Sequence, residues 1–552
     1  MGWVSPVAYA TASGLRMALE AIALSHILEL ACLVLFLLLI ALPSLYGFHM
    51  YLLMYLAHRR RAATRAAQQA WIADYQRRTP EEAWPRVTTQ LPLYNEVAVA
   101  RRVIEAAARM DYPAGRHEVQ VLDDSTDETR GVVDQVAAEL RAQGFDVKVV
   151  RRPTREHYKA GALAHGLKTA TGEFVAVFDA DFVPDRGFLR RLIPLFSMGD
   201  DVCVVQGRWG HLNANESWVT EGLSLGLDMH FAIEQAARNW NGLLMNFNGT
   251  GGIWRKSAIE DPRVGGWSGD TITEDLDLSY RAQLAGWRMV FCVDEVCPAE
   301  IPADVNALKA QQRRWAVGIM QVARKLLPDV WRSPRLTIWQ KLQATIHMTQ
   351  YAIAVPMIFV ALVGRLLPLA LTGDRWPTWI QWLCVTFLLA AVAPCLAYAN
   401  ARYVIGGGIP GPLRILKLMV LGLGLCVNNG VAVVTGLFQK GGEFVRTPKS
   451  GSTGRKKRAA YAGLRSNLWL VEVLLGLWCL VQWAYFLPQD GPGGLFLLLY
   501  AIGLLLMGWG SRPRFTGRTG VRKLRSVPAD SVPTFRPGVG VPDVLTPSPV
   551  GR

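Results

Sequence analysis

Phe174-Val175-Ala176-Val177-Phe178-Asp179-Ala180-Asp181 is the stretch that decides the fold class of this chain. Its apolar residues predict a short buried strand, and the first aspartate predicts where that strand ends. Side chains alternate along an extended segment, so the carboxylates of Asp179 and Asp181 point the same way. Carboxylates are hard oxygen ligands suited to Mg²⁺ or Mn²⁺, which in turn bind diphosphates. Taken alone, the same pattern can also be a strand end with two solvated acids.

Short apolar runs alternate with helical patterns on both sides of this stretch. Val87–Leu91, Val119–Leu122 and Val147–Val150 are apolar runs that end at polar residues, and Val97–Arg109 and Thr126–Gln143 are helical segments between them. This alternation predicts right-handed βαβ units and a mostly parallel sheet, which is an α/β fold. Ligands of such sheets bind outside the carboxyl ends of the strands. The polar residues expected at those ends are Tyr94, Asp123, Asp124, Asp179 and Asp181.

Asp123 and Asp124 end the second predicted strand. A carboxylate there can accept hydrogen bonds from a base edge or a ribose hydroxyl, although it can also cap the helix that follows. Tyr94 follows the first strand, in Pro92-Leu93-Tyr94-Asn95-Glu96, where it can stack on a base or simply belong to a turn. Lys159 can pair with a phosphate as a point charge, or remain a solvated lysine that opens a helix.

Thr273-Glu274-Asp275 begins a helical pattern after the glycine-rich stretch Asn248-Gly249-Thr250-Gly251-Gly252. Asp275 is the candidate general base, because a hydroxyl that attacks an anomeric carbon must lose its proton to a group within hydrogen-bond reach. The competing interpretation is an acid that caps the N-terminus of a helix.

Gln311, Arg314 and Trp315 are predicted to share one face of a short helix, because residues three and four apart are neighbours on a helix surface. Trp315 can lie against the C–H face of a sugar ring, and Arg314 can pair with a phosphate or a carboxylate. An amphipathic helix that lies on a membrane also places Trp and Arg at its surface, so the two interpretations are compatible.

Hydrophobic residues make up 51% of the 552-residue chain, which leaves room for a membrane domain beside a catalytic domain. The first apolar run, about Ile27 to Leu56, is too long for a signal peptide, so we interpret it as an uncleaved transmembrane helix. The basic run His58-Arg59-Arg60-Arg61 after it is expected to face the cytoplasm. The other predicted spans are Thr345–Leu366, Ile380–Ala399, Leu468–Leu487 and Gly494–Trp509.

Leu413–Phe438 is long enough to span, but Asn428 and Asn429 lie in its middle and both of its flanks are basic. A crossing would leave one basic flank outside, so we predict an interfacial or re-entrant helix on the cytoplasmic side. This gives five spans and a cytoplasmic C-terminus, in a multi-pass protein of the inner or plasma membrane. The basic tail from Ser511, rich in Pro and Gly, is predicted to be disordered.

The formal net charge of +15 comes from basic residues that follow the ends of membrane segments, which argues against a nucleic-acid partner. The eight cysteines show no spacing of a zinc site or a disulfide framework, as expected for a catalytic domain in a reducing cytoplasm. The predicted division is 1–58, a transmembrane helix; 59–84, a helical linker; 85–330, the catalytic domain; 331–510, the membrane domain with an interfacial helix at 413–438; and 511–552, the tail.

With these motifs in this order, the chain resembles the processive, membrane-integrated glycosyltransferases of family 2, which include the cellulose synthase catalytic subunit and plant glucomannan and xyloglucan-backbone synthases. The resemblance covers about Trp84 to Gly451. Phe247-Asn248-Gly249-Thr250-Gly251-Gly252-Ile253-Trp254-Arg255 and Gln206-Gly207-Arg208-Trp209-Gly210-His211 are closer to the plant mannan and glucan branch than to bacterial cellulose synthase.

The resemblance implies a GT-A catalytic domain between transmembrane helices and an inverting single displacement. It implies that Tyr94, Glu96, Asp123, Asp124, Lys159 and Asp179 bind the nucleotide-sugar donor, that Asp181 binds Mg²⁺ or Mn²⁺, and that Asp275, with Glu274 beside it, is catalytic. Gln311, Arg314 and Trp315 would hold the acceptor terminus and the pyrophosphate. Phe444-Val445-Arg446-Thr447-Pro448-Lys449 resembles the gating loop that closes over the nucleotide, with Phe444, Thr447 and Lys449 as its functional residues, although its Arg and Pro positions depart from cellulose synthase.

The expected function is metal-dependent transfer of a hexose, from UDP-glucose or GDP-mannose, to a growing β-1,4-glucan, mannan or glucomannan that passes through the membrane segments. Two alternatives stay open at this point. One is a non-processive transferase that makes a membrane glycolipid with the same motifs. The other is a transporter or scaffold with a degenerate nucleotide-binding domain, which intact Asp181 and Asp275 argue against.

Overall fold

The computed structural model describes residues 6–367, 378–442, 467–490 and 494–513. One compact unit, up to Arg512, contains all of the helices and strands discussed below. The predicted gating-loop residues Phe444, Thr447 and Lys449 lie outside the described residues, as does the predicted tail after Pro513.

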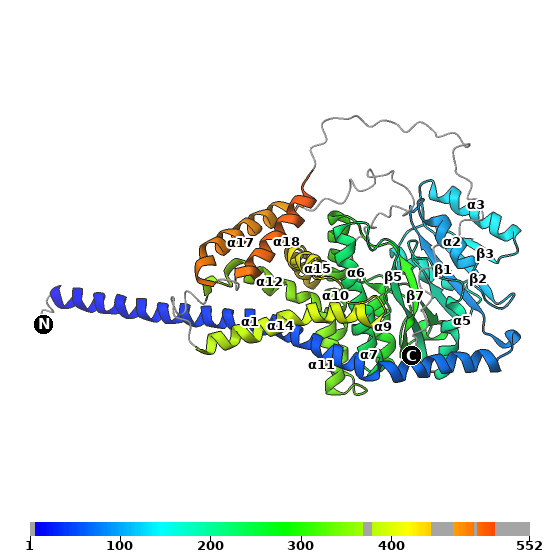
Figure 1. Cartoon of the computed structure of the whole chain (residues 1–552), viewed down its shortest axis with the longest axis horizontal. Coiled ribbons are helices and arrows are strands. Elements are labelled where there is room, and N and C mark those ends of the chain that lie inside the picture. Colours follow the sequence, from blue (N-terminus) through cyan, green and yellow to red (C-terminus); the bar gives the residue numbers. More distant parts are fainter. Residues whose placement is uncertain (1–5, 368–377, 443–466, 491–493, 514–552) are drawn as a thin grey trace, which may run out of the picture. The chain divides into compact units, whose positions relative to one another are not determined.

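A seven-stranded mixed sheet forms the centre of the catalytic region (Figure 1). Its strand order is β3-β2-β1-β4-β6-β5-β7. Strands β1, β2, β3 and β4 pair in parallel, and so do β5 and β7, whereas β6 runs antiparallel to both β4 and β5. The strands are β1 (Val87–Leu93), β2 (His117–Asp123), β3 (Val147–Val150), β4 (Phe174–Val177), β5 (Val202–His211), β6 (Gly252–Arg255) and β7 (Arg288–Ala299). The predicted α/β class, its four predicted strands and a mostly parallel sheet are confirmed, and the arrangement is GT-A-like.

Strand β4 is buried along its whole length, which explains why its sequence is continuously apolar instead of alternating. Its side chains still alternate between the two faces of the sheet. Ala176 belongs to the hydrophobic core that packs with α2 (Ala100–Ala108) and α3 (Thr129–Ala142). Val175 and Val177 belong to a second core, which packs with α4 (Tyr158–Leu167) and α9 (Glu274–Leu284). The sheet therefore has helices on both faces and an edge where β1, β2 and β4 end together.

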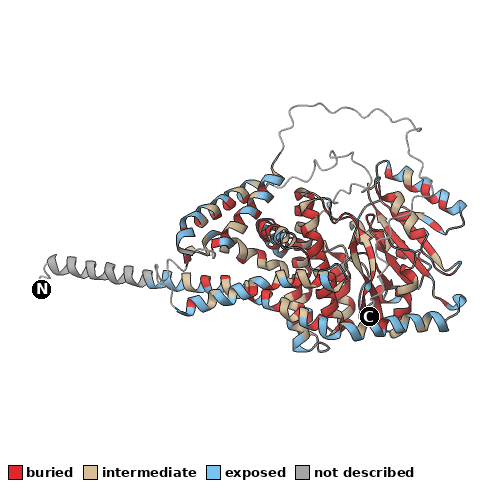
Figure 2. Cartoon of the chain, in the orientation of Figure 1, coloured by how far each residue is buried: buried red, intermediate tan, exposed pale blue. Residues whose placement is uncertain are grey.

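Helix α1 runs without a break from Pro6 to Arg78, so the predicted first span and most of the predicted helical linker form one helix; the rest of the linker contains a short 3-10 turn, Glu81–Ala83. Within the part of the chain that the structure describes, four helices are long and apolar enough to cross a membrane: His26–Arg78, Ile338–Val363, Thr378–Val404 and Trp469–Pro488. Large apolar side chains such as Leu28, Leu388 and Leu474 are exposed on these helices, as expected where a protein faces lipid. Figure 2 shows exposed stretches, in pale blue, along the helices away from the sheet.

The segment Leu413–Phe438 consists of two helices, α15 (Pro412–Gly424) and α16 (Cys426–Phe438), bent by 46° at their junction. By length the pair counts either as one broken span or as a re-entrant loop, so our prediction of an interfacial or re-entrant segment stays a prediction. The last predicted span forms α18 (Leu495–Ser511), an apolar helix of 17 residues that packs against α17 (Trp469–Asp490).

Helix α10 (Val305–Arg332) carries Gln311, Arg314 and Trp315 and is 28 residues long, so the prediction of a short helix was wrong. The Asp304 side chain caps its start by accepting hydrogen bonds from the backbone N–H groups of Asn306 and Ala307. The helix is stabilised along its length because it packs against α9 of the catalytic region and against α16 and α18 of the apolar helices. It thus connects the sheet region to the apolar helices.

Candidate active site

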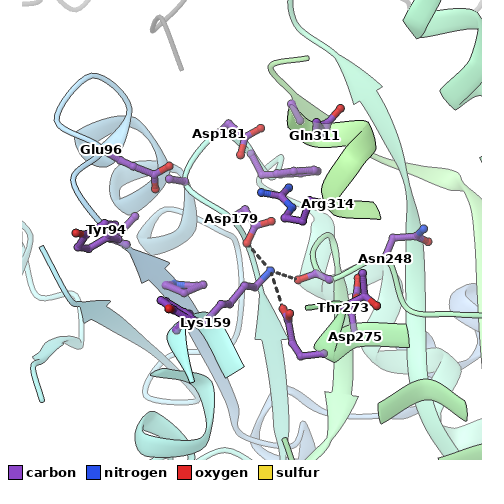
Figure 3. Close-up of a pocket in the computed structure, with 18 of the residues that line it drawn as sticks. Tyr94, Glu96, Lys159, Asp179, Asp181, Asn248, Thr273, Asp275, Gln311 and Arg314 are labelled. Atoms are coloured by element: carbon purple, nitrogen blue, oxygen red, sulfur yellow. Dashed lines mark hydrogen bonds and ion pairs between the residues drawn. The ribbon is translucent and has the colours of Figure 1, made fainter. Parts of the chain in front are cut away.

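A cavity of about 170 Å³ lies at the carboxyl ends of β1, β2 and β4. Residues from the ends of these strands and from the N-terminal parts of α4, α9 and α10 surround it (Figure 3). The structure brings together most of the predicted site residues, which lie far apart in the sequence. Those that line this cavity are Tyr94, Glu96, Asp124, Lys159, Asp179, Asp181, Glu274, Asp275, Gln311, Arg314 and Trp315.

Lys159 is the centre of the charged cluster in this cavity. Its Nζ lies 2.6 Å from Asp179 Oδ1, 2.8 Å from the carbonyl oxygen of Gly249 and 3.8 Å from Glu274 Oε1 (Figure 3). Burial lowers the pKa of Lys159, but Asp179 and Glu274 outweigh burial and hold this pKa above its usual value. The ammonium group therefore stays charged beside the carboxylates of Asp179 and Glu274.

Asp275 lies in the first turn of α9, where it is half-buried on the wall of the same cavity. Burial, and next the neighbouring Glu274 carboxylate, raise the pKa of Asp275 to about 7, although Lys159 acts in the opposite direction. A pKa near the working pH is the value at which a carboxylate accepts and releases a proton most effectively as a general base. The environment of Asp275 therefore suits the role predicted for it.

Gly249 allows the backbone to approach Lys159 and Asp275 closely. Its φ is +81°, in the left-handed region that favours glycine, and a Cβ at this position would meet Asp275 Oδ2 at 2.9 Å. The glycine-rich stretch before β6 thus serves the geometry of the charged cluster.

Arg314 adds a further cation to the cavity wall, and like Lys159 it is half-buried. Burial lowers its pKa, while Asp179, Glu274 and Asp275 act against that change. Nearby, the hydroxyl of Thr273 and the amide oxygen of Gln311 are buried and have no hydrogen-bond partner among the described residues. Buried polar atoms of this kind require a partner, which a bound ligand or water can supply.

Replacing Glu274 by Gln is expected to move the acid limb of the pH–rate profile to lower pH. The substitution removes a negative neighbour that raises the pKa of Asp275, so the base loses its proton at lower pH. The measurement is kcat/KM across the neutral range, which reports the pKa of the free enzyme. Lys159→Met is the matched variant with the opposite expected shift. Lys159 lowers the pKa of Asp275, so its removal should move the acid limb of the pH–rate profile to higher pH. An acid limb that stays in place in both variants would show that Asp275 does not control it.

The side of the cavity next to the end of β1 is built around Tyr94. The Arg155 guanidinium carbon lies 3.4 Å from the centre of the Tyr94 ring and 4.9 Å from that of Tyr158. Asp124 accepts from Arg152 Nε at 2.9 Å and from Arg152 Nη2 at 2.6 Å. Sequence reasoning missed both arginines, and the only available signal was the basic run after β3, since neither belongs to a recognised motif.

Asp123 does not line the cavity. Its side chain is fully buried, accepts a hydrogen bond from the Ser125 backbone N–H at 3.0 Å, and pairs with Arg151 at 2.8 Å. These contacts fix the turn after β2. The structure therefore places Asp124 on the cavity wall, whereas Asp123 is buried outside the cavity. The predicted donor contact of Asp123 stays a prediction.

Asp179 and Asp181 fit a divalent ion that arrives with a phosphate ligand. Mg²⁺ is usually bound by one or two carboxylates together with substrate phosphates and water. The end of β4 supplies two carboxylates at this cavity, and among the described residues no group of three or more His, Cys, Asp or Glu side chains could hold a metal by itself. The donor set therefore suits an ion shared with a diphosphate, not a closed structural site.

A second cavity, of about 380 Å³, adjoins the first. Apolar and neutral polar side chains from α6 (Trp218–Met229), α10, α15 and α16 form much of its wall. Its volume falls within the roughly 300–1,000 Å³ typical of small-molecule sites. The residues common to both cavities are Trp209, Leu227, Asn248, Thr273, Asp275 and Trp315. Asp275 thus lies on the wall shared by a cavity rich in charge and a cavity that is mostly uncharged.

Known proteins resemble this chain over the region that holds the site. Residues 85–318 match the family described as "Glycosyltransferase like family 2". Glucomannan 4-beta-mannosyltransferase 7 of Arabidopsis thaliana is 30% identical over 449 residues, which cover 78% of this chain and 77% of that protein. Glucomannan 4-beta-mannosyltransferase 1 of Oryza sativa is 40% identical over 264 residues, 47% of this chain and 50% of that protein.

For several curated relatives, including the rice protein, the match spans only about half of their length. Among solved structures, a mannosyltransferase from Pyrobaculum calidifontis in complex with GDP-Man and Mn2+ covers 70% of this chain at 20% identity, with a TM-score of 0.41. The Arabidopsis relative, matched over more than two thirds of its length, identifies the family. The chain belongs to glycosyltransferase family 2, in its cellulose synthase-like branch.

Proposed function

We propose that this protein is an inverting glycosyltransferase that moves a hexose from a nucleotide-diphosphate sugar to the end of a growing β-1,4-glycan of glucan, mannan or glucomannan type. The observation that carries the proposal is the position of Asp275 on the wall common to the two cavities. A donor in the charged cavity and an acceptor in the uncharged one would meet at this carboxylate.

The donor half of the site is suited to a nucleotide diphosphate. Tyr94 offers a ring on which a base can stack, and Glu96 and Asp124 lie beside it to contact the base or the ribose. Lys159 and Arg314 are cations on the cavity wall that would neutralise the departing diphosphate. Asp179 and Asp181 would hold a divalent ion, which when bound stabilises the charge that develops on the leaving group.

The acceptor half supplies the nucleophile. A terminal sugar packed against Trp315 and bonded by the Gln311 amide would present one hydroxyl to Asp275. Asp275 takes the proton of that hydroxyl as its oxygen bonds to the anomeric carbon, and the bond from this carbon to the diphosphate breaks. Because the attack comes from the side opposite the leaving group, one displacement inverts the anomeric configuration. A single base suffices, since cations rather than an acid stabilise the leaving group.

The second cavity extends toward the apolar helices and gives a growing chain a place beyond the terminal sugar. Its wall includes Met357 from α12 (Ala354–Val363), Leu421 from α15 and Asn429 from α16. We propose that the polymer leaves by this route through a multi-pass membrane protein whose catalytic region faces the cytoplasm. The interfacial or re-entrant α15–α16 segment would border this route.

The mannosyltransferase names of the relatives support GDP-mannose as the first donor to test, with UDP-glucose as the second. The experiment supplies each radiolabelled UDP- or GDP-sugar to the purified protein in lipid vesicles with Mg²⁺ or Mn²⁺. Label retained as polymer from one donor supports the proposal and names the sugar. Label found only in the organic extract would mean that the product is a glycolipid and not a polymer. Label transferred from no donor would contradict the proposal.

Replacing Asp181 by Asn is expected to raise the metal concentration that gives half-maximal transfer. Changing residues that only support a metal ligand typically costs 10–100-fold in metal affinity or activity, so loss of a direct carboxylate ligand should cost at least about tenfold. The measurement is initial rate against Mn²⁺ concentration at saturating donor. Asp185→Asn is the control, because Asp185 is an exposed acid nearby that pairs with Arg191. Equal metal dependence in the two variants would remove Asp181 from the metal site.

A further inference from the structure

One hydrogen-bonded pair of side chains in the second cavity, His230 and Glu234, has no part in the mechanism above. Helix α6 ends at Met229 and is followed by a π-helical turn, His230–Gln235, before α7 (Ala236–Trp240) begins. Such turns are rare and occur frequently at functional sites. This one places His230 and Glu234 on the wall of the second cavity.

The hydrogen bonds around His230 determine which of its nitrogens donates. Gln235 Nε2 donates to the carbonyl oxygen of Asn246 at 2.8 Å and to Asn248 Oδ1 at 2.6 Å. The amide of Asn248 is therefore oriented with its Nδ2 toward His230 Nε2, 2.9 Å away. Because an amide nitrogen can only donate, His230 Nε2 accepts and its Nδ1–H donates to Glu234 Oε2 at 3.0 Å. Asn248, His230 and Glu234 thus form one chain of hydrogen bonds.

Glu234 is an ionised carboxylate on the wall of a mostly uncharged cavity. Burial raises its pKa, but the hydrogen bond from His230 and the charge of Arg238 outweigh burial and hold this pKa well below its usual value. Its Oε1 accepts from Arg238 Nε at 3.1 Å, and its Oε2 accepts from His230. A carboxylate has about four acceptor positions, so Glu234 can still accept hydroxyl protons from a ligand in the cavity.

The position of this chain relative to Asp275 indicates what it would bind. Asn248 and Asp275 line both cavities, whereas His230 and Glu234 line only the second. The Asn248 side chain is turned away from Lys159 (Figure 3), toward the acceptor side. If the terminal sugar of an acceptor reaches Asp275, the next sugar of the acceptor would therefore lie beside Glu234.

We propose that Glu234, positioned by His230, binds a hydroxyl of the sugar next to the terminal sugar of a neutral β-linked hexose acceptor, and so sets how the terminal sugar is presented to Asp275. This inference rests on the proposed function, because it assumes a glycan in the second cavity. Glu234 accepts the hydroxyl proton in a hydrogen bond, and the second N–H of the Asn248 amide can donate to an oxygen of the same chain. His230 is a positioning residue, since it acts through Glu234.

The test compares acceptors of one and two sugars, since only the longer one reaches Glu234. Acceptor KM is measured for methyl β-mannoside and for β-1,4-mannobiose with the intact protein in vesicles, together with donor KM. In the wild type, mannobiose should bind more tightly than the monosaccharide. In Glu234→Gln and His230→Ala, the KM for mannobiose should rise about tenfold, the loss of one hydrogen bond to a charged group, while the KM for the monosaccharide and for the donor stays unchanged.

His58→Ala is the matched histidine control, because His58 is exposed and its only described hydrogen bond stays within its own helix. Arg238 is buried beside Glu234, so Glu234→Gln can fold poorly; His230→Ala, which keeps the Glu234–Arg238 pair, then decides the outcome. Equal losses on both acceptors, or a change in donor KM, would overturn the proposal. Failure of the proposed function is distinct, because the wild type itself would then transfer sugar to neither acceptor.

Discussion

Replacement of Asp275 by Asn is expected to lower the rate of sugar transfer by roughly 10²–10⁴-fold, the contribution of a positioned general base. The amide keeps the shape of the side chain but cannot take a proton. Donor binding should change little, because Tyr94 and Lys159 remain in place. In the wild type the rate should rise as pH passes upward through the pKa of Asp275, about 7, since the base works only after it has lost its own proton.

Two measurements separate loss of the base from loss of the fold. Nucleotide affinity, measured by isothermal titration in detergent, should match the wild type in Asp275→Asn. Asp146→Asn is the control, because Asp146 is exposed and lies outside both cavities. If Asp275→Asn retained most of the transfer rate, the proton would have to go to another group, and Glu274 would be the first to examine.

Replacement of Glu472 by Ala is expected to destabilise the protein by about 3–5 kcal/mol, the cost of leaving one member of a buried ion pair alone. Lys309 Nζ lies 2.7 Å from Glu472 Oε2 and 3.0 Å from Ser511 Oγ, and the two charged side chains are 2% and 0% exposed. Lys309 belongs to α10, two residues before Gln311 and five before Arg314, whereas Glu472 belongs to α17. Thermal unfolding in detergent measures the loss, and transfer should fall with it.

The double variant Lys309→Met/Glu472→Leu tests the cause of this loss. Well-packed apolar residues often replace a buried pair at no cost in stability, so the double variant should melt near the wild type. If it also recovers transfer, the pair serves stability alone; if transfer stays low, the pair also positions α10. A Glu472→Ala variant that unfolds at the wild-type temperature would contradict the buried pair itself.

The strands that could be predicted are those that a continuous run of apolar residues marks as buried. Val147–Val150 has the predicted bounds, and Phe174–Val177 differs from its prediction by one residue. The antiparallel strand β6 could not be predicted in this way, because its direction depends on where β4 and β5 lie, not on its own four residues. The length of α10 was missed for a similar reason: its packing against several helices continues the helix beyond the motif.

The site residues divide in the same way, into those that a local sequence pattern indicates and those that only the fold brings together. Short motifs identified the residues of the charged cavity, because each combines a reactive side chain with a strand end or a helix start. The Arg155–Tyr94 contact joins residues 61 positions apart, and no local pattern indicates it. His230 and Glu234 were missed because a helical pattern does not reveal a π-helical turn, and their meaning depends on Asn248, which the fold brings to them.

The most direct test of the central claim is the configuration of the bond that the protein makes. Product formed from radiolabelled GDP-mannose, whose mannose is α-linked, is digested separately with an endo-β-1,4-mannanase and with an α-mannosidase. A single displacement assisted by Asp275 predicts label that the mannanase releases and the α-mannosidase leaves intact, with far less product from Asp275→Asn in the same time. Label that only the α-mannosidase releases would mean that configuration is retained, and would contradict one base acting in one inverting step.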